Sequence, residues 1–390
     1  MILAGKLIAC LVWIFWMMII DNSVMGKSKT AHPMMDHSGM TLTEIEKVKQ
    51  MVMNKKDEPV LEYNPTYGTT FDRVVKRGFI ICGTNDEFPG FSEEVYDTES
   101  GAIWEGFDID VCKAVAAAVF GDTTAIQYEI VDGVSRFTHL IDGTIDMLSA
   151  ATTYTFTRNV LKKFEFLPTT YYDGQGFITK RTLGVSSAKQ MHGAKICFSG
   201  SGTAAKNIAD FMELHEIKYI PITVGENEKL KDVYLRGDCD MYGTDRSGLA
   251  SNRLGFKDPE LHMILPEIIS KEPLGPVVKY GDQKWSDIVR WTVYVLFIAE
   301  EMGINSKNID SFKENINPNI QRFMGEKNGA DHPNLGSKLG LPATWSYDII
   351  KKVGNYEEIF TRNIINKLGL KRGLNQLYNH GGLLYAPPLK

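Results

Sequence analysis

The motifs of the common enzyme classes are missing from this chain of 390 residues. It contains no G-x-S-x-G, H-E-x-x-H, Walker loop or G-x-G-x-x-G, so it carries no signature of a serine hydrolase, a zinc protease, a nucleoside triphosphatase or a dinucleotide-dependent dehydrogenase. Basic residues are not in excess either: the chain has 43 Lys and Arg against 48 Asp and Glu, which gives a formal charge of -5. Such a chain has no general attraction for phosphate backbones, and we expect no nucleic-acid partner. Apolar residues at 43% and charged residues at 23% exclude a mainly disordered chain and a polytopic membrane protein.

One long apolar run is present, at residues 7–20, and it is short for a membrane span. Its fourteen residues (LIACLVWIFWMMII) have no polar side chain and follow Lys6, which is typical of a signal peptide, whereas a span needs about 20 residues. Counted from Met1, the stretch reaches that length with only Lys6 inside it. We interpret residues 1–26 as a signal peptide or, alternatively, an uncleaved anchor, and expect the protein to be exported.

Residues 27–69 are rich in Lys, Met and polar side chains, and we expect a flexible extension there. Within it, His32, Met35, His37 and Met40 fall in a stretch of nine residues. Imidazole and thioether groups suit copper, above all the cuprous ion, so these four residues are a candidate metal site. A solvated linker that happens to be rich in Met is the alternative.

Cysteine is scarce, and none falls in a C-x-x-C or a Cys/His zinc spacing. The mature chain would keep four cysteines: Cys82, Cys112, Cys197 and Cys239. In an oxidising compartment we favour the local pairs Cys82–Cys112 and Cys197–Cys239, each of which joins neighbouring predicted elements. Four buried free thiols are the alternative.

From residue 79 onward, predicted strands alternate with predicted helices. The first half has strands at 79–83, 126–131 and 145–148 and helices at 108–120 and 134–141. The second half has strands at 194–198, 219–224, 240–242 and 261–265 and helices at 203–214 and 226–235. This alternation predicts an α/β protein with two lobes, each a parallel sheet with helices on both faces.

The two halves share the short sequence Gly-x-x-Asp-Met, at 143–147 and 237–241, where a helix would stop and a strand begin. Beyond residue 285 the chain is mostly helical, with candidate helices at 285–302, 345–359 and 363–378. We expect these helices to pack on a lobe rather than to build a third one.

A glycine-rich turn at Gly200-Ser-Gly202-Thr203 follows one predicted strand and opens a predicted helix. The free backbone N–H groups of a helix N-terminus form an anion site. A phosphate loop would need a following Lys-Ser/Thr, which is absent, so a carboxylate ligand is at least as plausible. An ordinary strand–helix turn is the alternative.

Residues 106–119 (GFDIDVCKAVAAAV) resemble, over fourteen positions, the signature of the extracellular solute-binding proteins of polar-amino-acid ABC transporters. Further segments resemble the general L-amino-acid-binding branch of that family (solute-binding protein family 3): 85–92 (NDEFPGFS), 152–158 (TTYTFTR), 171–177 (YYDGQGF), 244–249 (TDRSGL), 265–276 (LPEIISKEPLGP) and 383–388 (LLYAPP). The resemblance implies a two-lobe periplasmic-binding-protein fold of type II, made of two doubly wound sheets joined by a hinge of two segments. Lobe 1 would comprise residues 70–174 and 272–390, and lobe 2 residues 175–271.

The resemblance also implies a site for a zwitterion. Arg158 would hold the α-carboxylate with its planar guanidinium, Asp245 would accept from the ammonium group, and Phe88 would stack on the ligand side chain. Thr153 and the backbone near Ala151 would share the carboxylate end, with the N–H groups of Gly202 and Thr203 reaching it from the other lobe. Arg136 aligns with a residue that meets acidic ligand side chains. Core or surface roles are the alternatives for Phe88, Arg136 and Arg158.

Two segments depart from the general branch. Ala150-Ala151 stand where Arg-Asn is usual, and Ser199-Gly-Ser-Gly-Thr203 stands where Gln-Thr-Gly-Thr-Thr is usual. Both changes remove side-chain hydrogen-bonding groups, so selectivity would differ and we name no amino acid. Arg246, where the branch has Gln, would add a positive charge that favours an acidic or polar ligand.

We therefore expect a monomeric periplasmic protein that needs no cofactor, binds a free L-amino acid by hinge closure and delivers it to the membrane permease of an ABC transporter. An enzyme resembling the cyclohexadienyl dehydratases and a membrane-tethered amino-acid sensor are the rival hypotheses.

Overall fold

The computed structural model describes residues 69–98, 101–225, 228–325 and 334–390. The predicted signal peptide or anchor and the proposed metal ligands His32, Met35, His37 and Met40 lie outside these residues, so both stay predictions. Within the described part of the chain, no helix has the length and apolar character to cross a membrane.

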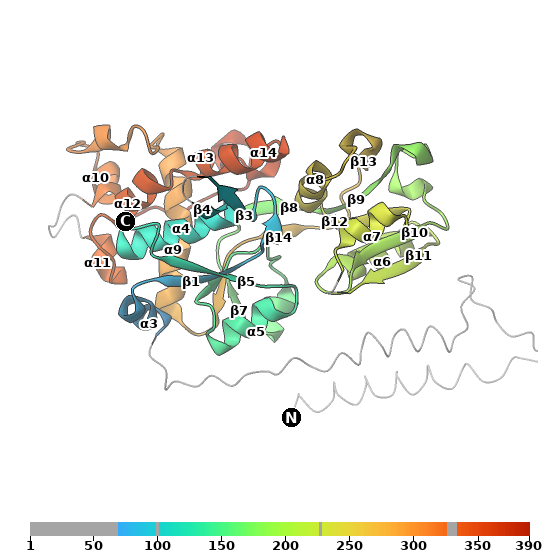
Figure 1. The fold of residues 1–390 in the computed structure, drawn as a ribbon. Helices are drawn as coiled ribbons and strands as arrows, with labels where there is room; N and C mark the ends of the chain where they lie inside the picture. Colours follow the sequence, from blue (N-terminus) through green and yellow to red (C-terminus); the bar gives the residue numbers. More distant parts are fainter. Residues whose placement is uncertain (1–68, 99–100, 226–227, 326–333) are drawn as a thin grey trace, which may run out of the picture. The chain divides into compact units, whose positions relative to one another are not determined.

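The first lobe is built on a five-stranded sheet (Figure 1). Its order is β5 (Ile126–Ile130), β1 (Ile80–Thr84), β6 (Met147–Leu148), β15 (Val277–Lys279) and β7 (Phe164–Phe166). The three strands β5, β1 and β6 are parallel, and the connections between them are α4 (Phe107–Phe120) and α5 (Ser135–Asp142). Gly106 opens α4 at φ 132°, where an added Cβ would lie 2.2 Å from the Phe91 carbonyl oxygen. Only glycine allows the chain to turn into α4 so close to its neighbour.

The second lobe repeats this plan. Its order is β11 (Ile220–Val224), β10 (Lys195–Ser199), β12 (Met241–Asp245), β9 (Gln175–Lys180) and β13 (His262–Ile264). The helices α6 (Ala204–Leu214) and α7 (Leu230–Arg236) connect the parallel strands and pack beside β10 and β12 (Figure 1). The prediction of two α/β lobes is confirmed.

Both sheets are mixed, although the alternating pattern predicted purely parallel ones. β15 runs antiparallel to β6, and β9 runs antiparallel to β12. Each of these strands enters its sheet from a crossing between the lobes, so it starts where a parallel strand ends: Val277 pairs with Leu148, and Gln175 with Asp245. Between the sheets, the two crossings pair as the short strands β8 (Tyr171–Asp173) and β14 (Glu272–Leu274).

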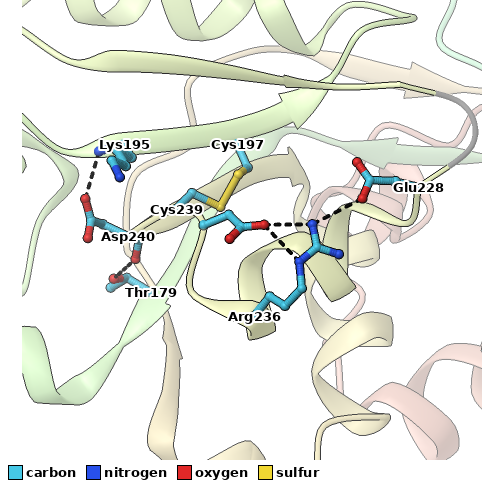
Figure 2. Close-up of a disulfide and its surroundings, with 8 residues drawn as sticks. Thr179, Lys195, Cys197, Glu228, Arg236, Cys239 and Asp240 are labelled. Atoms are coloured by element: carbon cyan, nitrogen blue, oxygen red, sulfur yellow. Dashed lines mark hydrogen bonds and ion pairs between the residues drawn. A yellow bond between two sulfur atoms is a disulfide. The ribbon is translucent and has the colours of Figure 1, made fainter.

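Each sheet is tied by one disulfide. Cys82 of β1 joins Cys112 of α4, and Cys197 of β10 joins Cys239 just before β12 (Figure 2). The predicted pairing is confirmed, and the alternative of four free thiols is not. The first bridge fixes β1 to α4, and the second fixes β10 to the turn that precedes β12.

The repeated Gly-x-x-Asp-Met sequence has the same structural role in both lobes. The carboxylate of Asp146 accepts the N–H of Ile81 at 2.7 Å, and that of Asp240 accepts the N–H of Lys195 at 2.8 Å (Figure 2). In each case the aspartate stands just before one central strand and binds the backbone of its parallel neighbour. The shared motif thus fixes strand pairing and takes no part in the candidate site.

The C-terminal helices pack on the first lobe. The long helix α9 (Gln283–Glu301) contacts α4, α12 (Trp345–Lys352) and α13 (Tyr356–Phe360). The prediction of one helix over 345–359 is wrong, because Gly354 at φ 94° separates α12 from α13. The prediction of a helix over 363–378 is also wrong, because α14 (Asn366–Leu368) ends at Gly369, which is left-handed at φ 66°. Glycine accepts this conformation with little strain and ends the helix.

A small antiparallel sheet completes the first lobe. It consists of β2 (Glu87–Phe88), β3 (Ser92–Asp97) and β4 (Gly101–Glu105). β2 contacts α8 (Arg246–Leu254), the helix that begins directly after Asp245. This sheet therefore brings Phe88 toward the second lobe.

Candidate functional site

The candidate site lies where strands of both sheets end at the lobe crossings. β6 ends beside the start of β15, and β12 ends beside the start of β9. In open α/β sheets, ligands bind beyond the carboxyl ends of the strands. The loop after β6 carries Ala151 and Thr153, the helical turn that follows it carries Arg158, and Asp245 is the last residue of β12.

The loop after β6 is held by hydrogen bonds from side chains of α4 and α5. The N–H of Ala151 donates to a carboxylate oxygen of Asp108 at 2.7 Å. Arg136 donates from Nη1 to the carbonyl oxygen of Ala150 at 3.1 Å. The predicted site residues Ala151 and Arg136 thus belong to one network, in which Arg136 binds the backbone of the loop.

Arg158 lies in a π-helical turn, Thr157–Leu161, shortly after this loop. Its Nη1 donates to the carbonyl oxygen of Thr153 at 2.8 Å, and its guanidinium lies 5.2 Å from the centre of the Phe137 ring. Thr153 is buried and forms a bridge with Leu274 of β14. The guanidinium is thereby fixed to the loop that reaches the lobe crossing.

On the second lobe, the glycine-rich turn leads into α6 as predicted. Gly202 is left-handed at φ 88°, and Thr203 is the residue that caps α6. The Thr203 hydroxyl lies 3.3 Å from both carboxylate oxygens of Glu272 in β14. Asn207, one turn into α6, donates to Glu272 at 2.7 Å. The start of α6 is therefore attached to a crossing strand by a buried carboxylate.

Three carboxylates gather at the crossings. Asp173 and Glu272 pair across β8 and β14, and Asp173 accepts the N–H of Ser247, two residues after Asp245, at 3.1 Å. Burial, together with the negative charges of Asp173 and Glu272, raises the pKa of Asp245 well above its usual value. Burial likewise raises the pKa of Asp173. Like charges held close together cannot all ionise easily, so this group favours a proton or a cationic partner.

Opposite charges from the two lobes also influence one another here. The positive charges of Arg158 and Arg136, both on the first lobe, oppose the rise in the pKa of Asp245 on the second. A free amino acid carries a carboxylate and an ammonium group, so a site with cations on one side and carboxylates on the other fits its two ends.

Phe88 lies between the lobes at the edge of this group. Its ring stacks on Phe91 with 4.6 Å between centroids. A Cβ added at Gly248 in α8 would lie 3.8 Å from its Cζ, so the ring reaches the first turn of α8. Its place next to the helix that follows Asp245 is compatible with stacking on a ligand side chain.

Arg246 turns toward its own lobe. Its Nη1 donates to the carbonyl oxygen of Leu265 at 2.8 Å. The guanidinium is thus engaged by the backbone after β13, and the expectation that Arg246 favours an acidic ligand stays a prediction.

Sequence reasoning missed Asp108, Asp173 and Glu272. All three stand inside segments that carry the family resemblance, and two of them, Asp108 and Glu272, are buried to 5% and 2% exposure. For Asp108, its place in the largely apolar segment 106–119 was an available signal, since buried carboxylates rarely lack a bonding role. No comparable signal marked Asp173 or Glu272.

The chain matches the family model "Bacterial extracellular solute-binding proteins, family 3" over residues 80–328. It is 46% identical over 324 residues to the general L-amino acid-binding periplasmic protein AapJ of Rhizobium johnstonii, covering 83% of this chain and 93% of that protein. It is 42% identical over 325 residues to the glutamate/glutamine/aspartate/asparagine-binding protein BztA of Rhodobacter capsulatus, covering 83% and 94%.

A solved structure is also similar. A periplasmic binding protein of an ABC transporter from Brucella ovis, with glutathione bound, has a TM-score of 0.79 and 40% identity. The match covers 83% of this chain and all of that one. The fold, the lobe plan and the sequence agree, and the chain belongs to the bacterial extracellular solute-binding proteins of family 3.

Proposed function

We propose that this protein binds a free L-amino acid between its two lobes in the periplasm and delivers it to the membrane permease of an ABC transporter. The observation that carries the proposal is that the positive charges of Arg158 and Arg136 on one lobe act on the carboxylate of Asp245 on the other. The names of the relatives AapJ and BztA support an amino acid as the ligand class.

Each end of the ligand has a partner of opposite charge in this proposal. Arg158 and the N–H groups of Gly202 and Thr203 hold the α-carboxylate. Asp245 accepts from the ammonium group, while Phe88 covers the side chain. Because these groups come from different lobes, the ligand stabilises the closed arrangement over the open one.

The hinge lies in the two crossings, near residues 173–178 and 265–278. Here β8 and β14 form a narrow pair of strands, which can change dihedral angles without disturbing either five-stranded sheet. The closed form then presents both lobes to the permease.

Glutathione is a second candidate ligand, because a similar protein from Brucella ovis has it bound. Its γ-glutamyl end carries an α-carboxylate and an α-ammonium group, so the same charged partners would hold it. A side chain longer than that of a free amino acid would then have to fit beside Phe88.

A thermal-shift screen of the twenty L-amino acids and glutathione tests the proposal, followed by calorimetric titration of each compound that stabilises the protein. We expect stabilisation by at least one amino acid and a decrease in the radius of gyration in solution scattering. If no amino acid stabilised the protein or bound to it at millimolar concentration, the proposed function would be overturned. Binding of glutathione alone would replace the amino acid by a γ-glutamyl peptide.

Three further parts of the proposal have separate tests. Mass spectrometry of the mature N-terminus distinguishes an exported, cleaved protein from one tethered by residues 1–20. Size-exclusion chromatography with light scattering measures whether it is a monomer. Assays with prephenate and arogenate test for dehydratase turnover, which we do not expect.

A further inference from the structure

One residue of the candidate site has a backbone conformation that non-glycine residues seldom adopt. Ala151 has φ 42°, in the left-handed region. In that region the Cβ of an L-residue crowds the backbone, so the conformation persists only where the surroundings enforce it. Ala151 lies between the end of β6 and Thr153, in the loop proposed to share the ligand carboxylate.

Asp108 supplies this restraint from the first turn of α4. One oxygen of its carboxylate accepts the N–H of Ala151 at 2.7 Å, and the other accepts the Ser149 hydroxyl at 3.0 Å. Both oxygens are thus used on one loop of three residues. The Asp108 side chain is itself nearly buried, at 5% exposure.

Arg136 is the charged side chain that faces Asp108. It belongs to α5, and it donates to the carbonyl oxygen of Ala150 and, at 3.4 Å, to the Thr152 hydroxyl. The positive charge of Arg136 stabilises the Asp108 carboxylate, and the two side chains hold successive peptide groups of the same loop. Neither side chain has to touch the ligand for the loop to keep its conformation.

Protonation of Asp108 would weaken this restraint. A carboxylate accepts two charge-assisted hydrogen bonds, whereas a carboxylic acid keeps one weaker acceptor and turns the other oxygen into a donor. The N–H of Ala151 would lose its strong acceptor, and the left-handed conformation would lose the contact that offsets its cost.

We propose that Asp108 is a positioning residue: its carboxylate holds Ala151 in the conformation that binds the ligand, and its protonation loosens the loop and weakens ligand binding in acid. The inference rests on the proposed function. Burial raises the pKa of Asp108 to about 6 against the opposing hydrogen bonds and the charge of Arg136. The change thus falls in a range that a periplasmic protein meets when the outside medium is acidified.

Calorimetric titration with L-glutamine between pH 5 and 8 tests the inference, because the charges of that probe do not change in this range. The Asp108→Asn variant imitates the protonated acid at every pH. We expect its Kd to be about tenfold that of the unchanged protein at pH 7.5 and nearly equal to it at pH 5. Using the ratio of the two Kd values removes the contributions of other titrating groups, Asp245 included.

Asp110→Asn is the matched control. Asp110 is a buried acid on the same helix, but it binds Arg362 and Asn363 rather than the loop. Its Kd ratio to the unchanged protein should be close to one at every pH. A Kd ratio for Asp108→Asn that is the same at pH 5 and 7.5 would overturn the inference.

A second variant tests the backbone conformation itself. Glycine adopts the left-handed region with little strain, so Ala151→Gly makes the restraint by Asp108 less necessary. We expect Asp108→Asn to weaken binding less in the Ala151→Gly background than alone. Should Asp108→Asn fail to fold, Ala151→Gly by itself still tests the inference, because it should make the Kd less dependent on pH.

The remaining outcomes are distinct. If Asp108→Asn weakened binding as much in the Ala151→Gly background as it does alone, the role assigned to Ala151 would be overturned. Failure of the unchanged protein to bind L-glutamine or any other amino acid would instead overturn the proposed function on which this inference depends. If binding weakened in acid equally in the unchanged protein and in Asp108→Asn, the proposed function would stand, but Asp108 would have no part in its pH dependence.

Discussion

Lys229, at the start of α7 on the second lobe, forms an ion pair with Glu87 in β2 on the first. Lys231 adds a second positive charge 3.9 Å from the same carboxylate. These contacts join the lobes beside Phe88, the next residue in β2. An ion pair of this kind contributes to closure only while the two lobes are together.

Glu87→Gln should therefore weaken amino-acid binding modestly and in a salt-dependent way. We expect a loss of about two- to threefold at low salt and none in about 0.5 M NaCl, because exposed pairs are weak and screened. Calorimetry at both salt concentrations measures it. The control is Glu94→Gln, an exposed glutamate of the same small sheet, and an equal loss at both salt concentrations would contradict the role of the pair.

Arg158→Ala should lower affinity for amino acids by about 100-fold or more, because it removes the main cation from the ligand carboxylate. Arg158→Lys keeps the charge but not the planar, two-pronged guanidinium, so its affinity should lie between those of the unchanged protein and Arg158→Ala. Titration calorimetry measures both variants. Arg181→Ala, which removes an exposed arginine bound to the Glu260 carbonyl, should bind normally; unchanged affinity in Arg158→Ala would refute the assignment.

Ligand binding should release a proton at pH values below the raised pKa of Asp245. Burial and neighbouring carboxylates raise that pKa well above its usual value, so below it the ligand-free site holds a proton that an ammonium group would displace. Affinity should consequently increase as the pH rises toward that pKa. Titration in two buffers of different ionisation enthalpy counts the protons, with Asp245→Asn as the variant that should release none; identical heats in both buffers would speak against this mechanism.

The Cys197–Cys239 disulfide should stabilise the second lobe without taking part in binding. It closes a loop of 42 residues, and restricting the unfolded chain in this way is worth about 3–4 kcal/mol. The double variant Cys197→Ser, Cys239→Ser should lose that free energy of unfolding, measured in urea, and still bind an amino acid. Unchanged stability would show that the bridge is not formed in the protein.

Ionisation of Asp108 should lower the stability of the folded protein but strengthen ligand binding. Its pKa is raised from 3.8 to about 6, so between these values the folded protein holds a proton that the unfolded chain has lost, and stability falls as the pH rises. From pH 5 to 7.5 the free energy of unfolding of the unchanged protein should decrease by about 1 kcal/mol relative to Asp108→Asn. Urea unfolding at both pH values measures this, and a change of opposite sign would contradict the raised pKa.

Much of the fold could be predicted because its signals are local. Alternating apolar runs set the strands and helices of both lobes, and the spacing of the cysteines in those elements gave the correct pairs. The end of α12 and the length of α14 were missed, since a glycine inside an amphipathic pattern ends a helix only when the chain there adopts the left-handed conformation. The antiparallel strands β9 and β15 were missed for another reason: strand direction depends on where a crossing enters its sheet.

The sequence alone determined the family, the two lobes and the residue types a zwitterion requires. The tertiary structure decided which charges meet. Residues as distant as Asp108 and Ala151, or Asp173 and Glu272, come together only through the register of the strands and the path of the crossings. Burial then changes the protonation of the carboxylates it encloses, and that depends on the dielectric environment that the whole fold creates, not on any neighbour along the chain.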